Sequence, residues 1–301
     1  MGIRGAKIGL SLAKRDGRDY RDISSLCTFV LEGKEYDLVG EVVSIPMTPE
    51  QMLEDQSLAL ERMHRAVKWA ERDGEKLVAV GLGSLCAIVA NRGRALQERL
   101  SIPVTTGNAA TAWTIVRNCL SVNPQKKEMA VIGAGSPVGQ IVVPYLLEQG
   151  IAVRADSKKL RKHVGVQIFS SAEECVREQE LIVGCGPTGP MVQTESIRRN
   201  ATILDVALPH SISDARSDIT VYLAERMSMP DNWQRGIWGI VYHLVSGYGY
   251  NTILACLVEP LIIAHSQRTK AFAQGRRLEM EDVLAFGDGA SQLGFHPVLS
   301  Q

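Results

Sequence analysis

The sequence has no net charge, because its 33 lysine and arginine residues equal in number its 33 aspartate and glutamate residues. A chain with this balance has no overall electric field that would hold a nucleic acid or an anionic membrane. Neither is therefore expected as a partner. An acidic partner would have to meet a local basic patch.

The sequence also lacks metal-ligand spacing and a long apolar segment. Its six cysteines form no CxxC pair and no Cys/His pattern that would close a tetrahedral zinc site. The most apolar segment, residues 252–264, is too short to span a bilayer and contains Glu259 and Pro260. Lys14 and Arg15 follow the first apolar stretch, where a signal peptide would have a cleavage site. We expect a cytoplasmic protein with reduced thiols, no metal and no membrane span.

The chain has enough apolar residues to bury one core or two. It has 301 residues, of which 45% are hydrophobic and 22% are charged. From about residue 128, β-like and helical stretches alternate, which predicts a parallel sheet covered by helices. We expect an α/β fold with a Rossmann-type parallel sheet, a second α/β domain and C-terminal helices that pack back on it. The predicted domains are a substrate- or acyl-binding domain (1–122), an NAD(P)-binding domain (123–240) and the C-terminal helices (241–301).

One helix is clearly predicted in the first domain. Thr48 can cap it, Pro49 suits its first position, and Gln51 can complete a capping box. The helix is expected to end before Gly74. Its predicted buried face is formed by Leu53, Leu60, Met63, Val67 and Ala70.

The segment AVIGAGSPVG places three glycines between a predicted strand and a predicted helix. Glycines at such a junction allow a tight turn and the close approach of backbone N–H groups to a pyrophosphate. The motif differs from the common fingerprint, because Val138 stands where the third glycine is usual. The residues expected to bind the cofactor here are Gly133, Gly135, Ser136, Val138 and Gly139.

The next predicted strand ends in a segment that bears on the choice of cofactor. Asp156 could bind a ribose diol, as in NAD sites. Arg154, Ser157, Lys158 and Lys159 could hold a 2′-phosphate, as in NADP sites, although a run of lysines is also typical of a solvated surface. These four groups favour NADPH, with NADH as the alternative.

Other loops that follow predicted strands are expected to line a ligand crevice, since ligands bind at the carboxyl ends of parallel strands. Gly186 is expected to contact the cofactor, and His210 either relays a proton or is an ordinary surface histidine. At two further junctions between a predicted strand and a predicted helix, small residues precede the helix. These residues either line a site or cap the helix. Their candidate substrate-binding residues are Gly83, Ser84, Thr105, Thr106, Gly107 and Asn108.

Cys256 lies in a predicted buried helix that Asn251 or Thr252 could cap. Cys256 would then lie about one turn into this helix. A cysteine in an apolar helix is ordinarily an inert, buried thiol. No basic residue lies one helical turn away, so the helix N-terminus or another segment would have to stabilise a thiolate.

The sequence resembles the aldehyde-forming long-chain acyl-(acyl-carrier-protein) reductases in residues 81–93, 104–113, 130–139, 253–262 and 275–298. This resemblance implies NADPH-dependent reduction of an acyl thioester to an aldehyde through an acyl group bound to Cys256. The partners it implies are the acyl thioester and an acidic acyl carrier protein. The local basic groups that could meet such a carrier are Lys158, Lys159, Arg161, Lys162, Arg276 and Arg277. Apolar helices after residue 247 could also build a homodimer.

Two other hypotheses remain open. The first is an NAD(P)-dependent dehydrogenase of a small hydroxy or amino acid, which needs no reactive cysteine. The second is a dinucleotide-binding sensor without catalytic activity. Replacing Cys256 with serine distinguishes the reductase from the dehydrogenase, and cofactor binding without turnover would favour the sensor.

Overall fold

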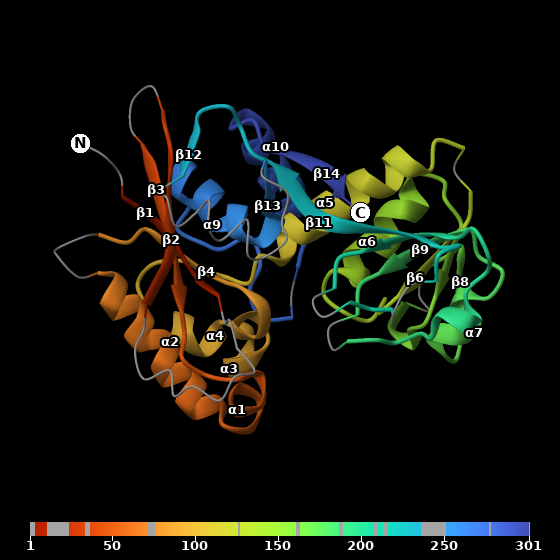
Figure 1. The fold of residues 1–301 in the computed structure, drawn as a ribbon, viewed down its shortest axis with the longest axis horizontal. Helices are drawn as coiled ribbons and strands as arrows, with labels where there is room; N and C mark the ends of the chain where they lie inside the picture. Colours follow the sequence, from red (N-terminus) through yellow and green to blue (C-terminus); the bar gives the residue numbers. More distant parts are fainter. Residues whose placement is uncertain are drawn as a thin grey trace. The chain divides into compact units, whose positions relative to one another are not determined.

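The computed structural model describes residues 4–10, 24–33, 37–71, 76–125, 127–160, 163–186, 189–207, 210–212, 216–235, 251–276 and 278–300 (Figure 1). Three of the basic residues named above, Arg161, Lys162 and Arg277, lie outside these ranges. Contacts divide the chain into unit 1 (Met1–Ala110, Ser228–Arg277 and Glu281–Phe295) and unit 2 (Thr111–Met227, Leu278–Met280 and His296–Gln301). The domain boundaries expected from the sequence stay predictions, because contacts define units and not independently folding domains.

Unit 1 is built on a mixed sheet with the strand order β12-β2-β3-β1-β4-β5. Strands β3, β1, β4 and β5 are parallel, whereas β2 is antiparallel to β3 and β12 is antiparallel to β2. The strands are β1 (Arg4–Leu10), β2 (Ser24–Leu31), β3 (Leu38–Ser44), β4 (Ala79–Leu82), β5 (Val104–Thr105) and β12 (Trp233–Arg235).

Helices α2 (Gln56–Ala70) and α9 (Ala255–His265) both pack on this sheet, and Figure 1 shows them on its two sides. Strand β13 (Thr252–Leu254) leads directly into α9. The expected return of C-terminal helices to the first sheet is confirmed by α9. The other helices in unit 1 are α1 (Pro49–Glu54), η2 (Ser84–Ala87), α3 (Val89–Arg92), α4 (Arg94–Gln97) and most of α10 (Met280–Gln292).

The helix predicted after Thr48 begins as expected but is two helices. Thr48 and Gln51 form the capping box at the start of α1 (Pro49–Glu54). The helix stops at Asp55, because the Asp55 carboxylate accepts a hydrogen bond from the Leu58 N–H (2.8 Å) and so caps α2. The predicted buried face is wrong for Leu53, which is 54% exposed, and right for Met63.

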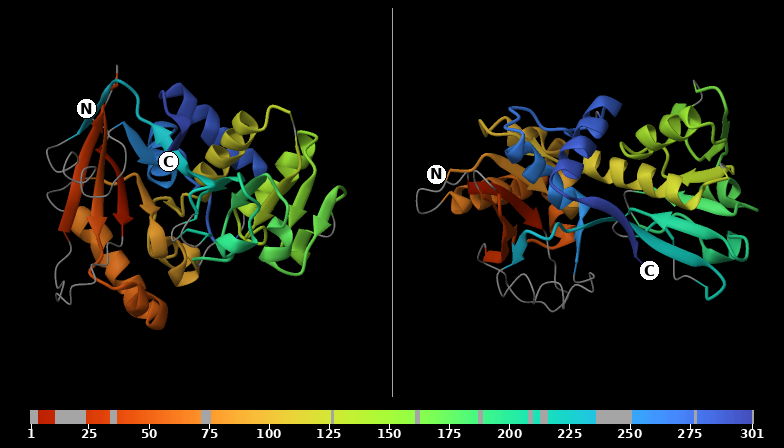
Figure 2. Two further views of the ribbon diagram at one scale, coloured as in Figure 1. Left: turned by 45° about the vertical axis from the view of Figure 1, so that its right-hand side comes forward. Right: turned by 90° about the horizontal axis from the view of Figure 1, so that it is seen from above.

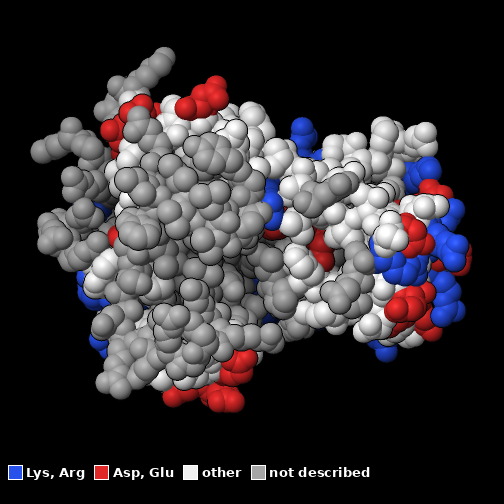
Figure 3. Space-filling model, viewed as in Figure 1, with Lys and Arg blue, Asp and Glu red and all other residues white. Residues whose placement is uncertain are grey.

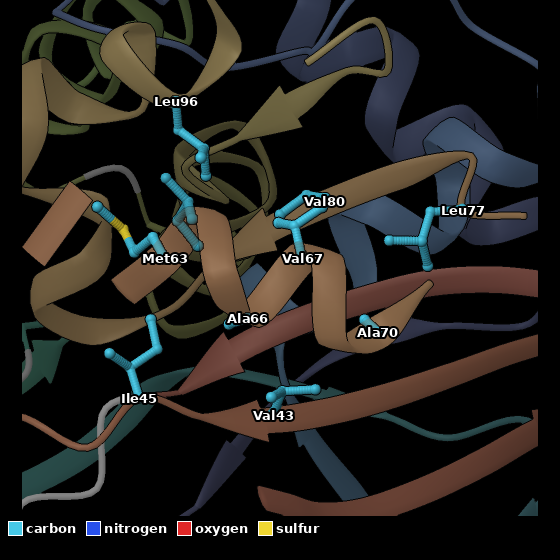
Figure 4. Close-up of a pocket in the computed structure, with 10 residues that line it drawn as sticks. Val43, Ile45, Met63, Ala66, Val67, Ala70, Leu77, Val80 and Leu96 are labelled. Carbon is cyan, nitrogen blue, oxygen red and sulfur yellow. The ribbon is translucent and has the colours of Figure 1, made fainter. Parts of the chain in front are cut away.

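Helix α2 and the sheet enclose a small apolar cavity, shown in Figure 4. Its volume of about 20 Å³, measured for the centre of a water-sized sphere, has room for about one water molecule. A cavity without polar walls stays dry, so we assign it to the core of unit 1. It is lined by Val43, Ile45, Met63, Ala66, Val67, Ala70, Leu77, Val80, Leu82 and Leu96.

Unit 2 contains a parallel sheet with the strand order β11-β10-β9-β6-β7-β8, and β14 pairs with β11 (Figure 2). This order reverses direction at β6, as in doubly wound nucleotide-binding sheets. The expected Rossmann-type fold class is therefore confirmed. The strands are β6 (Met129–Ile132), β7 (Val153–Ala155), β8 (Val166–Ile168), β9 (Leu181–Gly184), β10 (Thr202–Asp205), β11 (Thr220–Ser228) and β14 (His296–Ser300).

The helices of unit 2 cover its sheet. They are α6 (Gly139–Glu148), α7 (Ala172–Val176), η3 (Lys158–Leu160), η4 (Thr194–Ser196) and most of α5 (Asn108–Val122). Charges of both signs are mixed on the surface around α7 (Figure 3). Glu180 belongs to this surface and pairs with Lys127 (2.7 Å) and Arg198 (3.0 Å).

The described ranges contain neither a membrane-spanning helix nor a cluster of metal ligands. None of their helices combines the length and the hydropathy needed to cross a membrane. In the same ranges, no three His, Cys, Asp or Glu side chains come together as a set of metal ligands. The five cysteines for which side chains are described are all free thiols.

Candidate functional site

The loop between β6 and α6 carries the three glycines of the predicted cofactor site. Gly133 has a φ of +68°, and a Cβ atom there would lie 2.5 Å from the backbone nitrogen of Gly186. A Cβ atom at Gly139 would lie 2.6 Å from the Cα atom of Ala134. Both positions require glycine, because the loop packs closely on the loop after β9 and on the start of α6.

The start of α6 has the features of an anion-binding site. The N–H group of Gly139 donates to the Ser136 hydroxyl (3.0 Å). Among the described residues, the N–H groups of Gly135 and Val138 find no acceptor. Free N–H groups at the beginning of a ten-residue helix favour a bound pyrophosphate. The residues of this loop therefore fit a dinucleotide cofactor.

The Asp156 carboxylate supports this loop. It accepts hydrogen bonds from the N–H groups of Gly133 (2.8 Å) and Ala134 (2.9 Å). The Ser157 hydroxyl lies 2.7 Å from the position that a Cβ atom at Gly135 would take, and the Lys159 ammonium group donates to the Gly135 carbonyl (3.4 Å). The structure thus gathers three of the residues predicted to choose the cofactor around the glycine loop.

The other two residues predicted to choose the cofactor lie differently. The Arg154 guanidinium stacks on the Phe169 ring, 4.0 Å from its centroid, and donates to the Glu174 carbonyl (2.9 Å). The Arg154 guanidinium therefore already has partners, the Phe169 ring after β8 and the Glu174 carbonyl in α7. Lys158 is exposed and has room to meet a ligand.

A second group of polar residues lies at the carboxyl end of β10, where the sequence predicted only His210 and its loop. Asp205, which is 1% exposed, accepts hydrogen bonds from the N–H groups of Ala207 (2.9 Å) and Ser211 (2.7 Å). The Ser211 hydroxyl contacts the Asp205 carboxylate (3.1 Å) and accepts from the Gly186 N–H (3.1 Å). Asp205 and Ser211 therefore join the loops that follow β9 and β10.

His210 is placed on this framework by Asp205. Its Nδ1 atom lies 3.9 Å from Oδ2 of Asp205, and its side chain is 49% exposed. Burial raises the pKa of Asp205, which its hydrogen bonds from Ala207 and Ser211 oppose. A half-exposed imidazole beside a buried carboxylate can take up or give a proton at the edge of the sheet.

Glu225 is a site residue that the sequence did not reveal. Asp205 pairs with Leu223 across β10 and β11, so Glu225 extends beyond the end of β10 on the same face as Leu223. Glu225 is 5% exposed, neither carboxylate oxygen accepts a hydrogen bond, and its Oε1 lies 3.6 Å from Nε of Arg226. Burial raises the pKa of Glu225, which the neighbouring charge of Arg226 opposes.

Replacing Asp205 with asparagine should lower the free energy of unfolding by about 1–3 kcal/mol, because an amide NH₂ would face the N–H groups that now donate to the carboxylate. Chemical denaturation measures this loss. Asp218→Asn is the control and should lose much less, because Asp218 belongs to a solvent-accessible pair with Arg216. Equal losses in the two variants would contradict the structural role given to Asp205.

The candidate substrate residues of unit 1 lie at one edge of its sheet. Strands β4 and β5 run parallel, with Gly81 paired to Thr105. Gly83 and Ser84 follow β4, and Thr106 to Asn108 follow β5, so both loops leave the sheet at its carboxyl edge. This is the edge at which open α/β sheets bind ligands.

Gly107 packs directly on Cys256. It has a φ of +76°, and a Cβ atom there would lie 2.7 Å from the Cα atom of Cys256. The predicted cap of this helix is wrong, because residues 252–254 form β13 and Leu254 takes the cap position without a side-chain hydrogen bond. Cys256 is consequently the second residue of α9 and half-buried.

Glu259, one turn further along α9, is fully buried and has partners far away in the sequence. Its carboxylate accepts a hydrogen bond from the Ala110 N–H (3.0 Å) at the start of α5 and is bonded to the Thr105 hydroxyl. Burial raises the pKa of Glu259 to about 7. Glu259 therefore ties the loop containing Thr105 and Gly107 to α9.

The chain is similar to several known proteins. No family model matches it. It is 25% identical over 279 residues to aminotransferase PigE of Serratia sp. (strain ATCC 39006), and the match covers 85% of this chain and 32% of that protein. The chain thus spans about a third of the length of this curated relative.

Among solved structures, L-tryptophan dehydrogenase from Nostoc punctiforme is 12% identical, with a TM-score of 0.40, over 97% of this chain and 89% of that chain. A D-isomer-specific 2-hydroxyacid dehydrogenase from Xanthobacter autotrophicus Py2, in complex with NADPH, is 14% identical. Its TM-score is 0.31, over 60% of this chain and 78% of that chain.

These comparisons correct one expectation. The resemblance to acyl-(acyl-carrier-protein) reductases is wrong, because the curated relative that the chain matches is an aminotransferase. The covalent role given to Cys256, the acyl thioester substrate and the carrier protein rested on that resemblance. They lose their support with it.

Proposed function

We propose that the protein is an NAD(P)-dependent dehydrogenase of a small hydroxy or amino acid. One observation carries the proposal: the sheet of unit 2 reverses its strand order between β6 and β9, and the glycine loop lies at that point. Dinucleotides bind at this position in doubly wound sheets. The proposal needs no covalent intermediate.

The residues of unit 2 have separate roles in this proposal. Gly135 and Val138 bind the pyrophosphate through their free N–H groups at the start of α6, while Asp156 keeps the loop in shape by accepting from the N–H groups of Gly133 and Ala134. Ser157 and Lys159, which lie against Gly135, favour NADP over NAD. The nicotinamide, when bound, supplies hydride transfer.

His210 is the proposed acid–base residue. It accepts the proton of the substrate hydroxyl or ammonium group during oxidation, and Asp205 stabilises the resulting imidazolium. Ser211 and Gly186 hold the two loops together, so the imidazole stays at the edge of the sheet.

Binding and turnover should be measured separately to test this function. Fluorescence titration with NADPH and NADH measures binding, and reduced nicotinamide absorbance follows oxidation of a panel of 2-amino and 2-hydroxy acids. His210→Asn should lower kcat/KM by a factor of about 10² or more while cofactor affinity is retained. His163→Asn, a histidine elsewhere in unit 2, is the matched control.

Three results would oppose the proposal. Failure to bind either NADPH or NADH would rule out an NAD(P)-dependent dehydrogenase. Binding without turnover of any substrate would favour the sensor hypothesis. Unchanged turnover in His210→Asn would remove the proposed acid–base residue.

A further inference from the structure

The segment α3, which follows β4 and η2 in unit 1, is a left-handed turn and not a regular helix. Ala90, Asn91, Arg92 and Gly93 have φ values of 49°, 54°, 53° and 81°. Non-glycine residues in this conformation are strained, and backbone strain of this kind is concentrated at functional sites. The turn therefore needs an explanation beyond the connection of two elements.

Neighbouring segments hold the turn in place. The Gly275 N–H donates to the Arg92 carbonyl (2.9 Å), and the Ala90 N–H donates to the Gln56 side chain (3.2 Å). A Cβ atom at Gly93 would lie 3.0 Å from a methyl group of Leu82 at the end of β4. The turn is thus fixed at the carboxyl edge of the unit 1 sheet, where the loops after β4 and β5 also lie.

Three arginines lie in or beside this turn: Arg92, Arg94 and Arg276, which we call the basic cluster. The Arg94 guanidinium lies over Gly275, since its Cζ would be 2.9 Å from a Cβ atom there. Gly275 has a φ of +67° and is followed directly by Arg276. Burial and the charge of Arg276 lower the pKa of Arg92, which places these two charges close together.

No carboxylate in the described part of the chain pairs with these three guanidinium groups. Other arginines of unit 1 do have such partners: Arg99 pairs with Glu61, and Arg268 pairs with Asp282. Uncompensated like charges repel one another, and a bound oxyanion would relieve the repulsion. Guanidinium groups suit this task, because their planar N–H donors match two oxygens of a phosphate at once.

We propose that Arg92, Arg94 and Arg276 bind the phosphate group of a small ligand at the carboxyl edge of the unit 1 sheet. A phosphate dianion matches three positive charges better than a single carboxylate does. The loops after β4 and β5 leave the sheet at this edge, and the exposed Ser84 would face the rest of the ligand. This site belongs to unit 1 and does not depend on the proposed dehydrogenase function.

Isothermal titration of the full chain with inorganic phosphate, at an ionic strength held constant with sodium chloride, tests the proposal. Arg92→Gln and Arg94→Gln should each weaken phosphate binding about tenfold or more, because each removes charge-assisted hydrogen bonds. Arg94→Gln keeps the test valid if Arg92→Gln disturbs the strained turn, since Arg94 is exposed. Arg99→Gln, in the same part of unit 1, should change the affinity by less than about twofold, because Arg99 is already paired with Glu61.

A second titration with citrate separates phosphate from carboxylate ligands. Phosphate binding that is lost in the cluster variants and retained in Arg99→Gln supports the proposal. Absence of phosphate binding, equal weakening in all three variants, or binding of citrate in preference to phosphate would each overturn it.

Discussion

Gly133→Ala is expected to destabilise unit 2 by about 2–5 kcal/mol and to abolish dinucleotide binding. The φ of +68° is unfavourable for alanine, and the new Cβ atom would lie 2.5 Å and 2.6 Å from backbone atoms of Gly186 and Cys185. Backbone atoms cannot turn aside as a flexible side chain can. The loops after β6 and β9 would therefore have to separate at the point where the cofactor is expected to bind.

Gly150→Ala is a matched control for this experiment. Gly150 also has a positive φ, of +77°, but a Cβ atom there would have nothing within 4 Å. Gly150→Ala should lower the free energy of unfolding only by the conformational cost of alanine at positive φ, about 1–2 kcal/mol, and it should retain dinucleotide binding. Denaturation curves and fluorescence titrations of both variants provide the measurement. Similar behaviour of the two variants would contradict the close approach of the loops.

Glu259→Ala is expected to destabilise unit 1 by about 3 kcal/mol or more. The change empties a fully buried site and removes the partner of Thr105 and Ala110. Glu259→Gln should be well tolerated, since its oxygen can accept from the Ala110 N–H while its NH₂ donates to Thr105. The Thr105 hydroxyl then donates to the Ala273 carbonyl, which lies 3.1 Å away.

The pH dependence of stability provides an independent test of Glu259. Its pKa is about 7 in the folded protein and 4.5 as a reference, so the folded state favours the protonated acid. The contribution of Glu259 to the free energy of unfolding should be fully present below pH 4.5 and should fall as the pH rises to about 7, by up to roughly 3 kcal/mol. Glu259→Gln, which cannot ionise, should lack this decline. A decline of equal size in the glutamine variant would assign it to other groups.

Local patterns in the sequence predicted the parts of the fold that depend on neighbouring residues. The capping box of Thr48 and Gln51 and the glycine loop after β6 were both predicted, because each needs only a few consecutive residues. The second cap at Asp55 was missed, since the same apolar spacing suits one long helix or two short ones.

The candidate sites were less predictable, because their contacts join distant segments. Glu259 is separated from Thr105 by 154 residues and from Ala110 by 149. Nothing next to Glu259 in the sequence indicates a helix start as its partner. Asp205 was more accessible to prediction, because its bond to the N–H two residues later is typical of an Asx turn.

The pairing of β14 with β11 affects how the protein can form and how it can be divided. Strand β14 follows α9 and α10 in the chain, so β11 gains this neighbour only after those helices have been synthesised. A fragment of residues 111–227 would contain most of the Rossmann sheet but lack β14, and it would expose backbone N–H and C=O groups of β11. Exposed strand edges promote aggregation. Expression of the nucleotide-binding unit alone therefore requires a linked copy of residues 296–300.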